Sequence, residues 1–89
     1  MIRLFVRHSV NDYDRWRKVY DDFNAERAGM NVTDHAVYQE VDDPNDLTVT
    51  HDFSTVEAAR TFVGSARLKE VMEAAGVAGP PSLWFTNPA

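Results

Sequence analysis

The 89-residue chain has the length of one small domain, residues 1–89, whose own core supplies only modest stability. Its formal net charge is −5 and its nine basic residues are scattered, which argues against nucleic acid because phosphate binding needs clustered Lys and Arg. Because the chain has no cysteine, disulfide bonds and thiolate chemistry are excluded.

The apolar runs in the sequence are too short for a membrane-spanning segment or a signal peptide. The run over residues 2–6 is broken by Arg3 and falls far short of a signal-peptide core. No stretch approaches the roughly 20 apolar residues of a membrane span. We therefore expect a cytoplasmic protein with no membrane partner.

The chain begins with a predicted strand and a predicted helix. Residues 2–8 alternate between two faces: Ile2, Leu4, Val6 and His8 on one, Arg3, Phe5 and Arg7 on the other. Residues 12–28 have a helical apolar stripe: Tyr13, Trp16, Val19, Tyr20 and Phe23. Asn11 or Asp12 fits the N-cap, and Gly29 fits the position that ends the helix. Arg27 suits the negative end of the helix dipole.

A β-hairpin is predicted at the centre of the chain, over residues 34–53. Its strands, 35–40 and 47–53, flank an acidic turn over residues 41–46. In this turn Pro44 fixes φ, while Asn45 and Asp46 tolerate tight backbone geometry. Two of the three histidines of the chain, His35 and His51, lie on the hairpin strands.

The second half of the chain predicts a two-part helix and a last strand. Residues 54–57 have the S-x-x-E pattern of a capping box, with Ser54 as the cap. The helix pauses at Gly64, and Ser65 can cap a continuation that ends at Gly76. The two apolar stripes are Val56, Ala59, Phe62 and Val63, then Leu68, Val71, Met72 and Ala75. Residues 79–81 are interpreted as a rigid connector, and residues 82–86 as the final strand.

The resulting β-α-β-β-α-β order predicts an α+β, ferredoxin-like fold: a four-stranded antiparallel sheet with two helices on one face. In an even hairpin register the helix-facing side carries Leu4, Val6, Val37, Leu47, Val49, Phe53, Leu83 and Phe85. The other side then carries Phe5, Tyr38 and Trp84 among Arg3, Thr48, Thr50 and Asp52. A shift of one residue would reverse this assignment.

Three exposed aromatic side chains on one small sheet form a patch that monomers rarely show. A second copy is the simplest cover, and a two-fold dimer is the commonest arrangement. We therefore predict a homodimer packed through the open faces of the two sheets.

The chain resembles the dimeric α/β-barrel superfamily, and within it proteins of the antibiotic-biosynthesis-monooxygenase type. The resemblance covers the element order and a block over residues 48–76: a strand ending in His51-Asp52-Phe53, a helix opening after Ser54, a break at Gly64-Ser65 and the run from Leu68 to Met72. It implies a ligand cleft in each subunit, between the sheet and its helices. The family includes cofactor-free oxygenases, polyketide cyclases, lactone isomerases, haem-degrading enzymes and proteins of unknown role.

The histidines of the hairpin are the candidate catalytic residues. In the even register His51 and His35 share a face on neighbouring strands and can lie within a side chain of each other. A histidine in an apolar pocket can act as a general acid or base near neutral pH. The structural alternative is a hydrogen-bonded histidine pair at the sheet edge. His8 ends its strand and is expected at the surface.

The candidate ligand-binding residues are the aromatic side chains around these histidines: Tyr20, Trp16, Tyr13, Phe53 and Phe62. Stripes at helical spacing are usually core, yet amphipathic aromatics around a histidine also suit a flat aromatic or polyketide-like substrate. Tyr20 is the one expected to hydrogen-bond such a ligand. A hydrophobic small molecule is therefore the expected partner.

No metal or cofactor is predicted. The three histidines lack ligand spacing, and the acidic turn lacks the spacing of an EF-hand. The haem-degrading branch of the family uses a histidine on its second helix, and residues 55–75 contain none. Two functions remain open: a cofactor-free monooxygenase, cyclase or isomerase, or a non-catalytic ligand-binding or stress-related dimer.

Overall fold

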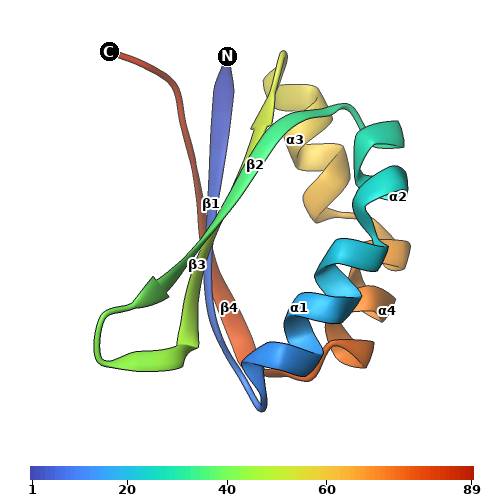
Figure 1. Cartoon of the computed structure of the whole chain (residues 1–89). Coiled ribbons are helices and arrows are strands. Elements are labelled where there is room, and N and C mark those ends of the chain that lie inside the picture. The colour runs from blue at the N-terminus through green and yellow to red at the C-terminus, as the bar shows by residue number, and fades with distance from the viewer.

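The computed structural model describes all 89 residues as one sheet with helices on a single face (Figure 1). The elements in chain order are β1 (Ile2–Val10), α1 (Tyr13–Asp22), α2 (Asn24–Gly29), β2 (Val32–Glu40), β3 (Asp43–Phe53), α3 (Val56–Val63), α4 (Ala66–Ala74) and β4 (Val77–Thr86). The four helices lie on the same side of the sheet, and the hairpin between β2 and β3 projects away from them. None of the helices is long and apolar enough to cross a membrane.

The sheet is antiparallel with strand order β2-β3-β1-β4, so the predicted ferredoxin-like α+β fold is confirmed. The predicted hairpin register is also correct, because Val37 lies opposite Val49 and His35 lies opposite His51. On the other side of β3, Val49 pairs with Val6 of β1. Side chains in register share a face, and this fixes the helix-facing set.

The helix-facing side of the sheet carries two buried apolar clusters. The first contains Val10, Trp16, Tyr20, Leu47, Val49 and Ala75. The second contains Leu4, Phe23, Phe53, Ala59 and Phe62. Leu83 and Phe85 pair with Val6 and Leu4 and so share this face, but they remain 39% and 36% exposed because β4 is the edge strand.

The first predicted helix is divided into α1 and α2 at Phe23. Backbone hydrogen bonding continues across the break, since the Arg27 N–H donates to the Phe23 carbonyl at 2.9 Å. The predicted N-cap is confirmed for Asp12, whose carboxylate accepts from the Asp14 N–H. The predicted stop at Gly29 is wrong: Gly29 is still helical, and Asn31, with φ of 68°, takes the left-handed conformation instead.

The second predicted helix is also divided, as its Gly64-Ser65 pause indicated. Ser65 caps α4 by accepting from the Leu68 N–H, as predicted. The predicted Ser54 cap is wrong by one residue, because the Thr55 hydroxyl accepts from the Ala58 N–H. Gly76 ends this region with φ of 78°, a conformation that a side chain rarely adopts.

The hairpin turn is tighter than predicted, because β3 already begins at Asp43. Glu40 pairs with Asp43 while Gln39 pairs with Leu47, so residues 44–46 form a bulge on β3. From this bulge the Asn45 side chain accepts a hydrogen bond from the Tyr13 N–H at 3.0 Å, at the start of α1. The prediction of a connector at residues 79–81 is also wrong, since these residues belong to β4.

Candidate active site

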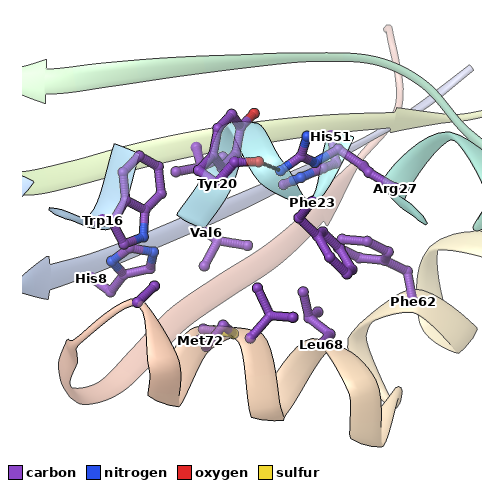
Figure 2. Close-up of a pocket in the computed structure, with 13 residues that line it drawn as sticks. Val6, His8, Trp16, Tyr20, Phe23, Arg27, His51, Phe62, Leu68 and Met72 are labelled. Atoms are coloured by element: carbon purple, nitrogen blue, oxygen red, sulfur yellow. Dashed lines mark hydrogen bonds between the residues drawn. The ribbon is translucent and has the colours of Figure 1, made fainter. Parts of the chain in front are cut away.

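A small cavity of about 60 Å³, here called the inner cavity, lies between the helices and the sheet (Figure 2). His8 and Trp16 lie toward one end of it, and Arg27 and Phe62 toward the other. Its lining is mostly apolar and consists of Val6, His8, Trp16, Tyr20, Phe23, Arg27, Val49, His51, Phe62, Leu68, Val71, Met72 and Ala75. The few polar groups of the lining are therefore surrounded by apolar side chains.

A larger depression of about 580 Å³, here called the outer groove, lies next to the inner cavity. It runs between the α3–α4 region and strands β1 and β4, and its lining includes Leu4, Val63, Val77, Pro81 and Leu83. Four apolar side chains line both spaces: Val6, Phe62, Leu68 and Met72. These four form the boundary between the two spaces.

Regular periodicity brings the lining residues together. Trp16, Tyr20, Phe23 and Arg27 are spaced by four, three and four residues, so they face the sheet along α1 and α2. Alternation along β1 and β3 presents His8, Val6, Val49 and His51 to the same space. The helix α4 closes the cavity with apolar side chains (Figure 2).

His51 is the buried histidine of the inner cavity, with 6% of its surface exposed. Its Nδ1 has no hydrogen-bond partner, and the Phe62 ring lies 4.8 Å from the imidazole, centroid to centroid. Burial lowers the pKa of His51 to about 3, and the positive charge of Arg27 contributes in the same direction. His51 is therefore a neutral imidazole at physiological pH, and its buried Nδ1 has no hydrogen-bond partner in the protein.

Arg27 is a buried cation, only 2% exposed, and no carboxylate forms an ion pair with it. Its Nη2 donates to the Tyr20 carbonyl at 2.8 Å, and its Nη1 donates to Asn24 Oδ1 at 3.3 Å. The guanidinium also lies 3.9 Å from the centroid of the Tyr20 ring, a cation–π contact. Its Nε has no partner, and burial lowers the pKa of the side chain.

His35, the second predicted catalytic residue, lies beside His51 but outside the inner cavity. The two rings are 6.2 Å apart, as expected for opposed residues on neighbouring strands. Its Nε2 contacts Asn24 Oδ1 at 3.1 Å, and Tyr20 Oη contacts its Nδ1. Since the amide oxygen can only accept, Nε2 donates and Nδ1 accepts the Tyr20 hydroxyl proton. Both nitrogens of His35 are therefore engaged, Nδ1 by Tyr20 and Nε2 by Asn24.

His8 is buried, so its predicted surface position is wrong. Strand β1 continues to Val10, which places His8 inside the sheet with only 7% of its surface exposed. Its ring lies 5.8 Å from that of Trp16, and its Nδ1 has no hydrogen-bond partner. Burial lowers the pKa of His8, so it is a second neutral imidazole in the inner cavity.

The predicted ligand-binding residues fall into two groups. Tyr20, Trp16 and Phe62 line the inner cavity, whereas Tyr13 and Phe53 do not. Tyr13 is half-buried and packs against Trp16, while Phe53 is fully buried beneath Phe62. Phe53 is therefore a core residue in this arrangement.

Sequence reasoning missed Arg27, His8 and the contribution of α4. The signal for Arg27 was its spacing, since it continues the stripe of Trp16, Tyr20 and Phe23 in helical steps. The signal for His8 was its place on the apolar face of residues 2–8. The structure contains no group of three His, Asp or Glu residues that could hold a metal ion.

The sheet topology and the two paired helical segments give this chain a ferredoxin-like fold, which it shares with solved structures of antibiotic-biosynthesis-monooxygenase-like proteins. A Bordetella bronchiseptica protein provisionally assigned to that activity superimposes with a TM-score of 0.85 at 16% identity, over 99% of this chain and 96% of that one. SnoaB from Streptomyces nogalater, a cofactor-independent oxygenase, gives a TM-score of 0.76 at 15% identity, over 99% and 94%. A conserved protein from Methanosarcina mazei gives 0.79 at 16%, over 99% and 92%.

No protein-family model matches the sequence, and a search of curated proteins found no match. At these low identities the likeness to the solved structures is one of fold.

Proposed function

We propose that this protein is a small enzyme of the cofactor-free oxygenase, cyclase or isomerase kind, acting on a hydrophobic aromatic or polyketide-like molecule. The observation that carries the proposal is His51, a neutral buried imidazole with an unpartnered Nδ1 in an apolar cavity. The activity of SnoaB, a cofactor-independent oxygenase with the same fold, supports the same class of chemistry.

In this proposal His51 removes a proton from an activated carbon or a phenol of the substrate. A neutral imidazole can accept that proton at Nδ1 without first losing one, and the apolar walls keep water from competing for it. His35 acts as a positioning residue, because its Nδ1 accepts from the Tyr20 hydroxyl while its Nε2 is held by Asn24. Tyr20 and Trp16 then supply stacked aromatic surface, with their rings 4.8 Å apart.

The size of the two spaces indicates how a substrate would lie. The inner cavity, at about 60 Å³, is far smaller than the several hundred Å³ typical of ligand pockets, whereas the outer groove reaches about 580 Å³. We therefore place the body of the substrate in the outer groove and its reacting end in the inner cavity. Met72, a flexible side chain on the boundary, is the residue best suited to move aside.

The proposed working form is a homodimer. Phe5 and Trp84 stack in parallel on the open face, 5.4 Å apart, and Tyr38 and Trp84 are 59% and 44% exposed. A second copy would cover this apolar surface and leave the helix-facing side free for a ligand. Light scattering at micromolar concentration tests this: a mass twice the 10.1 kDa of the chain is expected, and a mass of 10.1 kDa contradicts it.

The catalytic proposal is tested with His51→Ala on a substrate found by screening phenols and ketide-like compounds. We expect turnover to fall by about 10²–10⁴, as for loss of a general base, while the oligomeric state is unchanged. His35→Ala is the matched control, since it removes a neighbouring histidine whose nitrogens are already engaged, and we expect a loss of about tenfold or less. Unchanged turnover in His51→Ala would remove His51 from the mechanism.

The small inner cavity favours a second candidate, a dimer that binds a ligand without changing it. In that case the wild-type protein binds the screened compounds but forms no product, and His51→Ala changes affinity alone. Product analysis by mass spectrometry separates the two candidates directly.

A further inference from the structure

We infer that the Arg27–His51 end of the inner cavity is a binding subsite for an anionic oxygen of the ligand. The role of this subsite in catalysis rests on the proposed function. The subsite adds to that proposal the chemical class of the substrate. That class is a weak acid that becomes an enolate, phenolate or carboxylate at the atom nearest Arg27.

The charge of the site supports this inference. Arg27 is 98% removed from solvent, yet its hydrogen bonds go to two neutral oxygens, those of Tyr20 and Asn24. A buried guanidinium is costly unless an anion balances it, and proteins normally supply one from their own side chains. The buried carboxylate of this chain, Asp52, pairs with Arg3 on the opposite face of the sheet, and the partly buried Asp46 pairs there with Arg7. The balancing charge for Arg27 is therefore left to a ligand.

The free hydrogen-bonding atoms point to the same place. Among buried side-chain nitrogens without a partner, two belong to this end of the cavity, Arg27 Nε and His51 Nδ1. The remaining walls here are Phe23 and Phe62, which offer no hydrogen bonds. A volume of about 60 Å³ suits one small charged group rather than a whole ring, so the rest of the molecule must extend outward.

Proton transfer and anion binding are coupled in this arrangement. When the ligand's O–H or C–H bond breaks, the proton moves to His51 Nδ1 and the electron pair stays on the ligand, beside Arg27. The product is an imidazolium next to an anion, and that anion offsets the repulsion between His51 and Arg27. Binding an anion therefore raises the pKa of His51 from its low value and makes it a better base.

Several groups surround His51 and enter its pH dependence. Arg27 on α2 and His35 on β2 oppose a positive charge on His51, whereas Asp52, its chain neighbour, favours one. Tyr20 on α1 contributes its ring, 6.4 Å from that of His51. The side chains of α4 at the cavity, Leu68, Val71 and Met72, carry no titratable group.

The test is a titration of the protein with nitrate, followed by NMR of the His51 ring and the Arg27 Nε–H. Nitrate stays ionised between about pH 5 and about pH 7, so any pH dependence of binding belongs to the protein. We expect a saturable shift of both signals and tighter binding at the lower pH, because an anion favours protonated His51. No saturable shift at either signal would overturn the inference, as water filling the cavity would give that result.

Two variants make the test specific. Arg27→Gln should weaken nitrate binding by about tenfold or more, the usual effect of losing a charged hydrogen-bond partner. Arg17→Gln is the matched control, since Arg17 also lies over the Tyr20 ring, at 5.4 Å, but is paired with Asp21 outside the cavity. Equal loss in both variants, or none in Arg27→Gln, overturns the subsite.

If Arg27→Gln fails to fold, the wild-type titration still decides, because it needs no variant. Nitrate binding uses no substrate and no turnover, so its failure is distinct from failure of the proposed enzyme activity. If turnover depends on His51 but nitrate does not bind, the proposed function stands and this inference is wrong.

Discussion

The two faces of the sheet handle charge in opposite ways. On the open face the arginines of β1 are paired: Arg3 donates to Asp52 at 2.8 Å, and Arg7 donates to Asp46 at 2.7 Å. On the helix-covered face Arg27, His8 and His51 are buried, and each has a nitrogen without a partner. The charged groups of the open face are thus paired, whereas each of these three covered side chains keeps one nitrogen without a hydrogen-bond partner.

This difference supports the proposal that the covered face, rather than the open face, binds a ligand. Paired surface charges contribute little to stability and are screened by salt. Unpaired polar groups in an apolar cavity destabilise the folded chain, and they persist where a ligand or a reaction uses them. Under the proposed function, the covered face is therefore the one on which stability and function conflict.

Removing a core side chain from the covered face should have the largest effect. Phe53→Ala is expected to lower the free energy of unfolding by about 3–5 kcal/mol, because Phe53 is fully buried. Phe5→Ala, on the open face, should cost clearly less in a dilute sample, measured by the same urea titration. Equal costs at low protein concentration would contradict the contrast between the faces.

Acid should destabilise the protein through the covered face first. The pKa of His51 is about 3 in the folded chain and about 6.5 unfolded, so the unfolded state takes up a proton as pH falls below about 6.5. The contribution of neutral His51 to the free energy of unfolding is therefore complete above that pH. By about pH 4.5 the protonation of His51 in the unfolded state alone lowers the free energy of unfolding by about 2–3 kcal/mol.

Urea unfolding of the wild type and His51→Leu between about pH 7 and about pH 4.5 measures this loss. The variant should have a flatter profile in that window. The lowered pKa values of Asp46 and Asp52, held down by Arg7 and Arg3, matter only at lower pH, where the carboxylates begin to protonate. An unchanged profile in His51→Leu would assign the acid sensitivity elsewhere.

Replacing the unpaired cation with an apolar side chain of similar length should stabilise the protein. Arg27→Met removes a buried charge while keeping most of the packing, and we expect a gain of about 1–2 kcal/mol in unfolding free energy. The gain is limited because the contact with the Tyr20 ring is lost. A loss of stability instead would mean that this contact and the two hydrogen bonds outweigh the cost of burial.

The smallest effect is expected for the paired charges of the open face. Arg7→Gln removes the ion pair with Asp46, in which the Arg7 side chain is 55% exposed. Its urea midpoint should match that of the wild type within error, at low and at high salt. A clear loss at low salt only would show that the open face also depends on charge.

Much of the fold could be predicted because periodicity and turn chemistry are local properties. The alternation in residues 2–8 and the pairing of Val37 with Val49 determined the faces of the sheet. Element ends were less predictable, as Thr55 and Asn31 show, because neighbouring residues of similar chemistry compete for the same cap or turn.

The candidate site was predicted in part for a similar reason. His51 and Tyr20 followed from face and spacing, but Arg27 did not, because a cation at the end of a helical stripe is usually solvated. Nor could the sequence reveal that His35 uses both nitrogens on Tyr20 and Asn24, since those contacts join three separate elements. The hydrogen-bond partners of such side chains depend on tertiary packing, which the spacing of residues in the sequence does not show.

The hydrogen bond from the Tyr13 N–H to Asn45 ties the first turn of α1 to a strand bulge outside the cavity. The helix carrying Trp16 and Tyr20 is thus oriented partly by a residue that no ligand would touch. We therefore expect substitutions in that bulge to tilt Trp16 and Tyr20 and, under the proposed function, to change which ligands bind without altering the contacts of His51.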